Sequence, residues 1–383
     1  MKVIGIICEY NPMHRGHQKQ IDLIKRTFTE ECGIVCIMSG NFVQRGAPAI
    51  VDKGLRAKAA VLSGADLVLE LPVTAALSSA EGFAAEGVRL LAPFCDYLCF
   101  GAETADAYAL QRTAEALLSP DFSPVLRTQL DQGLSFPAAR QAALESMGIE
   151  GNLLTSPNNI LAVEYCKAIL SQSTAMKPFP ILREGRYHDT LADPENPSAT
   201  AVRTLMLQGG NWLDYVPKQA KAVFMDAVLH TKYAGERAML ATLRTMTDEE
   251  FEAVPFGSEG LWRKLMHAAR SEATVEDIAT AVKSKRYTRS RIDRMMMCAF
   301  LGLTQEHLHT PTPYARVLAL NGKGRELLKT ARKHGNYPNI GEKIDHPYQE
   351  LENRCADLYA LFAEGAPEPP GLEAKRRIYY HHA

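Results

Sequence analysis

The sequence predicts an α/β fold, in which a doubly wound parallel sheet is followed by a mainly α-helical C-terminal domain. Three observations support this prediction. Over about the first hundred residues, short β-branched runs alternate with helical patterns. The expected strands are apolar throughout, as in sheets that carry helices on both faces. The chain has 383 residues, enough for two domains of roughly 100–200 residues each.

The first half of the chain supplies the expected sheet. We expect strands over Val3–Cys8, Ile34–Met38, Leu67–Leu71, Tyr97–Phe100 and Lys177–Leu182. We expect helices between them, over His17–Arg26, Leu55–Leu62, Ala80–Leu91, Ala107–Met147 and Pro157–Leu170. Ligands bind such sheets beyond the carboxyl ends of the strands, so the loops that follow the strands are the candidate sites.

A domain boundary is expected close to Asp214. Beyond that residue the strand patterns fade and helical patterns dominate. The predicted units are therefore residues 1–214, an α/β domain, and residues 215–383, a mainly helical domain.

The composition argues against a uniformly basic nucleic-acid-binding protein, a membrane-spanning or secreted protein, and a cysteine metal site. The net charge of −1 gives no overall attraction to nucleic acid, so any basic surface must be local. We find neither a run of 18 or more apolar residues nor a secretory leader pattern. The eight cysteines are scattered, several of them inside apolar runs, and are expected to pack rather than to bind metal. A cytoplasmic protein that makes no contact with membranes is the expectation.

The segment Glu9–His17, between the first expected strand and the first expected helix, has the composition of an anion site. A turn at a helix start presents free backbone N–H groups and the positive end of the helix dipole, which suit a phosphate. His14 and His17 can face the same anion, and Gly16 would allow the backbone to approach it. On spacing alone, two surface histidines beside a turn remain the alternative.

A resemblance distinguishes these two interpretations. A strand followed by H-x-G-H resembles the signature of the HIGH-motif nucleotidyltransferase superfamily, which includes class I aminoacyl-tRNA synthetases and cofactor adenylyltransferases. A second superfamily element, I-S-S-T-x-x-R, is matched by Ser198, Thr200 and Arg203. The sequence departs from that element at Ala199, which puts one hydroxyl contact in doubt.

Further blocks resemble the bacterial tRNA(Met) cytidine acetate ligase family. They comprise residues 8–12, 38–46, 66–72, 100–103, 156–161 and 285–288. The resemblance implies a nucleotidyltransferase catalytic domain over residues 1–214 and a tRNA-binding domain over 215–383. It also implies two steps. Acetate attacks the α-phosphate of ATP, and the acetyl group of the resulting acetyl-adenylate passes to the N4 amine of the wobble cytidine of elongator tRNA(Met), forming N4-acetylcytidine.

The resemblance also implies roles for individual residues. His14 and His17 are the expected catalytic residues, which stabilise the transition state at the α-phosphate. Mg²⁺ carried by the nucleotide would assist the departure of pyrophosphate, and no metal ligand is expected in the protein. The residues expected to line the ATP site are Ile7, Cys8, Glu9, Tyr10, Asn11, Pro12, Met13, His14, Arg15, Gly16, His17, Gln18, Lys19, Gln20, Gly101, Asn158, Asn159, Arg183, Ser198, Thr200 and Arg203. Gly101 fits independently, because a glycine just past a strand end lets adenosine approach the backbone.

Gln44 and Arg45 are the candidates for binding acetate. Arg45 could hold a carboxylate through two parallel hydrogen bonds. Downstream, Lys53, Arg56 and Lys58 stand at an expected helix start. They are predicted either to face phosphate or RNA, or to form a solvated helix face.

A local basic run, residues 283–294, supplies the expected RNA-binding surface. We expect its cations to lie outside while Ile292, Met296 and Phe300 pack inward. Tyr287 is expected to stack on an unpaired base beside the phosphate contacts. The candidate tRNA-binding residues are Lys283, Lys285, Arg286, Arg289, Arg291 and Arg294. A solvated charged surface is the alternative.

Two other functions stay open at this stage. One is a small-molecule adenylyltransferase of the pantetheine-phosphate or nicotinamide-mononucleotide type, in which a phosphate attacks ATP. The other is a nucleotide-responsive RNA-binding protein without turnover. The helical extension of about 170 residues argues against the first, and the two histidines with the Ser198, Thr200 and Arg203 element argue against the second.

Overall fold

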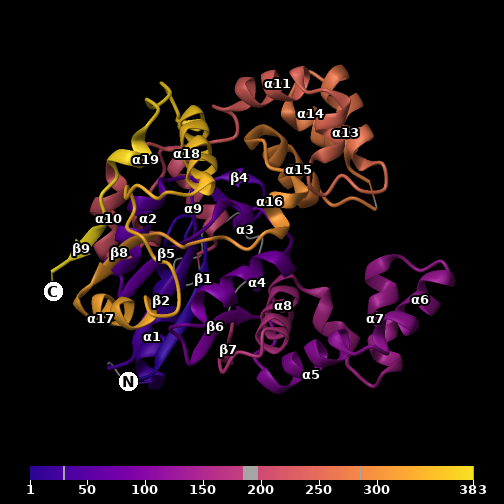
Figure 1. Ribbon diagram of the computed structural model, residues 1–383, viewed down its shortest axis with the longest axis horizontal. Coiled ribbons are helices and arrows are strands. Elements are labelled where there is room, and N and C mark those ends of the chain that lie inside the picture. The colour runs from indigo at the N-terminus through magenta and orange to yellow at the C-terminus, as the bar shows by residue number, and fades with distance from the viewer. Residues whose placement is uncertain (29–30, 184–196, 285, 383) are drawn as a thin grey trace.

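The computed structural model describes residues 1–28, 31–183, 197–284 and 286–382. Within these residues a seven-stranded sheet forms the centre, with strand order β7-β6-β1-β2-β5-β8-β9 (Figure 1). The first five strands of that order run parallel. Their bounds are Val3–Cys8 for β1, Gly33–Ser39 for β2, Leu67–Leu71 for β5, Tyr97–Ala102 for β6 and Lys177–Leu182 for β7. The doubly wound parallel sheet is therefore confirmed.

Helices cover both faces of the sheet, which explains why the strands are apolar throughout. Ile4 and Ile6 of β1 pack on one face and Val3 and Ile7 on the other. The first face is covered by α1 (Arg15–Phe28), α2 (Lys53–Leu62), α9 (Ala199–Leu207) and α10 (Lys218–Met225). The second is covered by α4 (Ala80–Leu91), α5 (Ala107–Leu118), α8 (Pro157–Ser171) and α17 (Gly322–Ala331).

The strand order creates a switch point between β1 and β6. From β1 the chain proceeds to β2 and β5 on one side, and then returns to place β6 on the other side of β1. In open α/β sheets the crevice at such a point, beyond the carboxyl ends of the strands, is where ligands bind. The segments Glu9–His14 and Glu103–Asp106 begin at this edge.

Two strands of the sheet come from the second half of the chain. β8 (Val317–Asn321) pairs antiparallel with β5, and β9 (Tyr379–His381) pairs parallel with β8. The expectation that strands fade beyond Asp214 is wrong for these two, which are only five and three residues long. A domain boundary after residue 214 stays a prediction.

A second hydrophobic core lies among the helices that follow residue 235. Its main helices are α11 (Glu236–Thr245), α12 (Asp248–Ala253), α13 (Leu261–Ser271), α14 (Val275–Val282), α15 (Arg289–Leu301) and α18 (Pro347–Tyr359). Figure 1 shows α11, α13 and α14 grouped to one side of the sheet. A hairpin of β3 (Phe42–Val43) and β4 (Ala47–Pro48) reaches this core, because Phe42 is buried within it.

The remaining helices are short or peripheral. They are α3 (Val73–Ala76), α6 (Phe122–Asp131), α7 (Phe136–Ser146), α16 (Gln305–His309) and α19 (Leu372–Lys375). Figure 1 shows α6 and α7 projecting at one end of the molecule. In the described part of the chain, every helix is too short or too polar to span a membrane.

Candidate active site

His14 and His17 lie against each other where α1 begins. Their rings are stacked, with centroids 3.7 Å apart. Nδ1 of His14 accepts the N–H of Gly16 at 3.1 Å, and Nδ1 of His17 accepts the N–H of His14 at 3.3 Å. A neutral imidazole that accepts at Nδ1 carries its proton on Nε2. Both rings therefore have an Nε2–H donor.

Burial and nearby cations keep both histidines neutral. Burial first, and then His17, Arg183 and Arg203, lower the pKa of His14 well below its ordinary value of 6.5. Burial and Arg183 lower the pKa of His17 to about 3. At neutral pH the two rings are consequently hydrogen-bond donors, while the guanidinium groups carry the positive charge.

Gly16 is required by the ring of His14. A Cβ atom at position 16 would lie 2.9 Å from Cε1 of His14, closer than non-bonded carbon atoms approach. The expected reason for this glycine was the approach of an anion to the backbone. The structure gives a different reason, because the missing side chain makes room for the catalytic candidate itself.

The other residues of the segment 7–20 differ in where their side chains lie. Ile7, Tyr10 and Met13 are buried in the hydrophobic core, so only their backbone could reach a ligand. Asn11 and Pro12 are buried as well, and their peptide bond is cis. Arg15 and Lys19 are exposed, whereas Gln20 is half-buried.

Four polar contacts fasten this segment to its neighbours. The Cys8 thiol donates to the Ile37 carbonyl at 3.8 Å, and the Gln20 amide donates to the Cys99 sulfur at 3.4 Å. The Gln18 amide donates to the Ser63 carbonyl at 3.0 Å. Glu9 accepts the Gln44 N–H at 2.8 Å. These side chains hold the loop and α1 in place, and their contact with ATP stays a prediction.

The second superfamily element lies beside the first. Arg203 donates to the Asn11 carbonyl at 2.7 Å and to the Thr200 hydroxyl at 3.1 Å. The Ser198 hydroxyl accepts the Ala201 N–H at 3.1 Å and so caps α9. Residues almost 200 positions apart in the sequence thus bring an arginine and a helix start to the histidines, as a site for a polyanion requires.

The end of β6 is joined to the start of α8. Glu103 accepts the Asn158 side-chain N–H at 2.7 Å and the Asn159 backbone N–H at 2.8 Å. Asn158 in turn accepts the Arg183 guanidinium at 3.0 Å. Arg183 follows β7, and its backbone N–H donates to the Ala102 carbonyl at 2.9 Å. Glu103 was not predicted as a site residue, although it ends the block 100–103 at the switch point.

Gly101 leaves open space above the sheet. It lies within β6, one residue before the strand ends, and not past the strand as expected. Among the described residues, a Cβ atom there would meet only the Arg183 Cβ, at 4.0 Å. The surface above Gly101 is therefore open on the described side, and the approach of adenosine to it stays a prediction.

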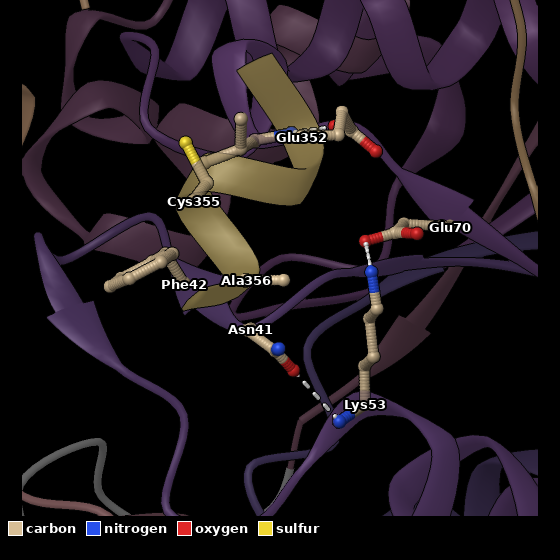
Figure 2. Close-up of a pocket in the computed structure, with 8 residues that line it drawn as sticks. Asn41, Phe42, Lys53, Glu70, Glu352, Cys355 and Ala356 are labelled. Carbon is tan, nitrogen blue, oxygen red and sulfur yellow. Dashed lines mark hydrogen bonds and ion pairs between the residues drawn. The ribbon is translucent and has the colours of Figure 1, made fainter. Parts of the chain in front are cut away.

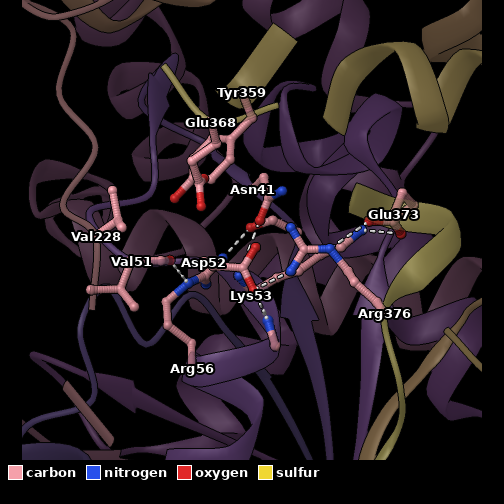
Figure 3. A network of polar contacts seen from close by, with 12 residues as sticks. Asn41, Val51, Asp52, Lys53, Arg56, Val228, Tyr359, Glu368, Glu373 and Arg376 are labelled. Atoms are coloured by element: carbon pink, nitrogen blue, oxygen red, sulfur yellow. Dashed lines mark hydrogen bonds and ion pairs between the residues drawn. The ribbon is translucent and has the colours of Figure 1, made fainter. Parts of the chain in front are cut away.

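Lys53 and Arg56 are buried, so neither of the two expectations for them is correct. Arg56 is completely buried and donates to the carbonyls of Glu9, Ser39, Gly40 and Val51. It therefore ties the loop after β1 to the loop after β2. Figure 3 shows both cations at the start of α2, together with Tyr359, Glu373 and Arg376 from the C-terminal part of the chain. Lys58 is half-buried and lies 5.1 Å from the Tyr379 ring.

Lys53 belongs to a cluster of buried ion pairs. Its ammonium lies 2.7 Å from Glu70 and 2.8 Å from Glu373, which also pairs with Arg316 at 2.8 Å. Figure 2 shows Lys53 pointing toward Glu70 below α18. The cavity there measures about 10 Å³, room for about one water and not for a nucleotide. Burial and nearby Glu70 raise the pKa of Glu352, which lines it, to about 7.

The acetate candidates lie in the turn of the β3–β4 hairpin. Gln44 is half-buried and Arg45 is exposed. The hairpin tip packs directly on α15, because a Cβ at Gly46 would lie 2.3 Å from the carbonyl carbon of Asp293. Arg294 donates to the Gln44 carbonyl at 3.3 Å. The pocket for acetate stays a prediction.

The basic run is more tightly bound to the protein than expected. Arg289 pairs with Glu276 at 2.5 Å and with Asp293 at 2.9 Å. Arg286 pairs with Glu259 at 2.9 Å. Lys283 is exposed, and Lys285 lies outside the described residues.

Three other members of the run lie inward. Tyr287 is buried and donates to the Glu259 carbonyl at 3.1 Å, so the expected base stacking by this ring is not supported. Arg291 donates to the Phe256 carbonyl at 2.8 Å. Arg294 lies over the Phe256 ring at 5.1 Å. Ile292, Met296 and Phe300 are buried as expected. RNA contact by this run stays a prediction.

Comparison with known proteins identifies the family. A family model described as HIGH Nucleotidyl Transferase matches residues 1–369. The tRNA(Met) cytidine acetate ligase of Clostridium acetobutylicum is 35% identical over 373 residues, which cover 92% of this chain and 92% of that protein. The chain belongs to the tRNA(Met) cytidine acetate ligase family. The Clostridium tetani member is 36% identical over 388 residues, with 94% and 96% of the two chains covered.

Solved structures of another member have the same fold. The apo crystal structure of Thermotoga maritima TmcAL matches with a TM-score of 0.90 and 29% identity, over 100% of both chains. A second structure of that protein, described as bound with alpha-thio ATP, matches with a TM-score of 0.87 and 28% identity, again over 100% of both chains.

Proposed function

We propose that this protein is an ATP-dependent ligase that acetylates the N4 amine of the wobble cytidine of elongator tRNA(Met). The observation that carries the proposal is the convergence of His14, His17, Arg183 and Arg203 at the switch point of the sheet. These groups are donors and cations only, which suits a triphosphate. Homologues over more than 90% of the chain are named as this ligase, and one relative binds alpha-thio ATP.

In the first step an acetate oxygen attacks the α-phosphorus of ATP. A bond forms between that oxygen and phosphorus, the bond from phosphorus to the bridging oxygen breaks, and pyrophosphate leaves. The Nε2–H groups of His14 and His17 donate to the oxygens on which negative charge develops, without transferring a proton. Arg183 and Arg203 supply the compensating charge. Acetyl-adenylate is the product.

In the second step the cytidine amine attacks the acetyl carbonyl carbon. The carbon–nitrogen bond forms, AMP leaves as the mixed anhydride breaks, and the amine loses a proton. The basic run 283–294, which continues into α15, is proposed to contact the tRNA, through Lys283 and the exposed Arg286 first. Surface ion pairs such as Arg286–Glu259 contribute little, so a phosphate can replace the carboxylate.

Mg²⁺ is proposed to arrive with the nucleotide. Over residues 1–28, 31–183, 197–284 and 286–382, no group of three or more His, Cys, Asp or Glu side chains could hold a metal ion. The side chains of His14, His17, Arg183 and Arg203 are donors and cations, which bind phosphate oxygens and not a metal. The proposed steps therefore use only groups of the protein, and the ion belongs to the substrate.

The test is incubation of the protein with ATP, labelled acetate and bulk tRNA, followed by analysis of the tRNA for acetylated cytidine and of the supernatant for AMP. Acetylcytidine that requires both acetate and ATP supports the proposal. Acetate-independent turnover with a phosphate acceptor would indicate the adenylyltransferase instead. Binding of tRNA without turnover would indicate the non-catalytic RNA-binding protein.

The histidine role is tested separately with His14→Ala. We expect this variant to lose acetyl-adenylate formation, measured as acetate-dependent exchange of labelled pyrophosphate into ATP, while its tRNA affinity stays unchanged. Loss of tRNA binding with intact exchange would contradict the assignment.

A further inference from the structure

Glu103 fills the N-terminus of α8 in the way that a bound phosphate fills other helix starts. Its carboxylate accepts three donors: the Asn158 side chain at 2.7 Å, the Asn158 backbone at 3.3 Å and the Asn159 backbone at 2.8 Å. The N–H groups at the start of this helix are thus already bound by the protein's own anion. The side-chain oxygen of Asn158 is not used in these contacts and points toward Arg183.

That oxygen holds Arg183. An amide has a donor end and an acceptor end, and Asn158 directs its NH₂ at Glu103 and its oxygen at the guanidinium, 3.0 Å away. A carboxylate accepts only, so Glu103 permits one orientation of this amide and excludes the flipped one. Partial burial works to raise the pKa of Glu103, but the hydrogen bonds from Asn158 and Asn159 leave it lowered, so the group stays ionised.

Arg183 acts on both histidines. Its charge is among the causes that lower the pKa of His14 and of His17, and it stands directly after β7, two strands away from β1, which leads to His14. Its backbone is fixed to β6 through the Ala102 carbonyl. The Asn158 contact orients the long side chain.

We propose that Glu103 is a positioning residue for the ATP step, which acts by fixing the Asn158 amide so that its oxygen holds the Arg183 guanidinium beside His14 and His17. The inference rests on the proposed function for the identity of the step. It adds a residue that does not touch the nucleotide but determines where one of its cations lies. Groups that orient the ligands of a metal ion change affinity or rate by about 10-fold to 100-fold when removed, and we expect an effect of the same order for Glu103.

The main test is a double-mutant cycle of Glu103→Gln and Arg183→Gln, with ATP affinity by calorimetry and acetate-dependent pyrophosphate exchange as the readouts. A glutamine at position 103 adds an NH₂ group that favours the flipped Asn158 amide, whose own NH₂ would then face Arg183. We expect Glu103→Gln to weaken ATP binding or exchange by about 10-fold or more. In the Arg183→Gln background the same change should have an effect below about twofold, because the two residues act as one unit.

A matched control separates positioning from helix capping. Asp106, in the same loop, caps α5 by accepting the Tyr108 and Ala109 N–H groups at 2.9 and 3.1 Å. Asp106→Asn should lower the melting temperature and leave ATP affinity and exchange unchanged. Glu103→Asp, which keeps an acceptor-only group, should recover most of the activity that Glu103→Gln loses, and provides the comparison if the glutamine variant does not fold.

Two outcomes would overturn the inference. In one, Glu103→Gln lowers the melting temperature as Asp106→Asn does, with ATP affinity unchanged. In the other, Glu103→Gln weakens ATP binding or exchange by the same factor in the parent and in the Arg183→Gln background. Failure of the proposed function would give a different result, because the parent protein would then bind ATP but show no acetate-dependent pyrophosphate exchange. The double-mutant cycle could still be measured through ATP affinity.

Discussion

At the scale of single residues, the two histidines show how a short motif determines its own protonation. Each ring accepts a backbone N–H at Nδ1, and burial with nearby arginines disfavours a second proton. The motif needs the glycine between them, because the His14 ring occupies the space of a side chain at position 16. A neutral pair of Nε2–H donors follows from this packing.

Acid should destabilise the protein through these histidines. A histidine whose folded pKa lies below its unfolded value contributes stability above pH 6.5 that is lost as the pH falls toward the folded value, about 3 for His17. When the pH falls from 7.5 to 5.5, the free energy of unfolding of the parent should decrease. We expect the decrease in His17→Gln to be about 1.4 kcal/mol smaller. Urea denaturation at the two pH values measures this. His267→Gln, on an exposed histidine, is the control, and identical pH dependence in all three proteins would contradict the prediction.

The residue types at the site could be predicted from the sequence, but the direction in which each side chain points could not. His14, His17 and Arg203 belong to motifs that recur with their spacing, so the sequence indicates them. Arg56 does not belong to a motif of this kind. A cation at a helix start is typical of a surface group, and only the fold places it under four carbonyl groups from loops far apart in sequence. Glu103 was missed for a related reason, since it acts through Asn158, 55 residues away.

At the scale of elements, the β3–β4 hairpin connects the sheet to the helical core. Its residues bind in both directions, with the Gln44 N–H on Glu9 and the Gln44 carbonyl on Arg294. Gly46 has a φ of 72° and touches the backbone of α15. The hairpin, whose first part belongs to the block 38–46, is therefore also the element that α15 packs against.

Gly46→Ala should be markedly more harmful than an equivalent change elsewhere. Position 133 has a φ of 83°, and a Cβ atom there would meet nothing within 4 Å, so Gly133→Ala tests the backbone term alone, about 1–2 kcal/mol. At Gly46 an alanine has the same cost from its positive φ. Its Cβ atom would in addition overlap with the backbone of Asp293 and Arg294, which costs about 1–3 kcal/mol more. Chemical denaturation of both variants measures the difference, and equal losses would show that the hairpin moves away from α15 at little cost.

Strand bounds could be predicted for three strands of the sheet, of which β1 and β5 are buried and β7 is half-buried. The bounds of β1, β5 and β7 agree with the prediction residue for residue. β8 and β9 were not predicted. β9 has three residues and lies at the sheet edge, where pairing partners rather than composition determine the structure. β8 is buried between β5 and β9, but it lies in a part of the sequence where helical patterns dominate. The helical character of residues 235–301 was predicted, but the inward direction of Tyr287 and Arg294 depends on packing that periodicity does not encode.

At the scale of the whole molecule, distant parts of the chain meet in one buried cluster of charges. Lys53 at the start of α2, Arg316 beside β8 and Glu373 from α19 lie within hydrogen-bond distance of one another in pairs. Glu373 is the shared acceptor, and Figure 3 shows it with Arg376 opposite the start of α2. Removal of one partner from such a cluster leaves charges buried without compensation.

Glu373→Gln should therefore destabilise the entire fold. We expect a loss of about 3–5 kcal/mol in the free energy of unfolding, because Lys53 and Arg316 stay buried while their shared carboxylate becomes neutral. Glu326→Gln, which removes the exposed partner of Lys329, is the control and should leave the midpoint unchanged. Denaturation followed by tryptophan fluorescence measures both. A small loss for Glu373→Gln would mean that water reaches the cluster.

The position of Glu373 in the sequence also affects how the protein is made. Lys53 leaves the ribosome 320 residues before its partner does. At roughly 5–20 residues per second, the interval is about 16 to 64 seconds. For most of that time the nascent sheet lacks β8, for all of it the sheet lacks β9, and the lysine has Glu70 but not Glu373 as a partner. In the emerging N-terminal half, the edge of β5 therefore has no partner strand until residues 317–321 have been translated.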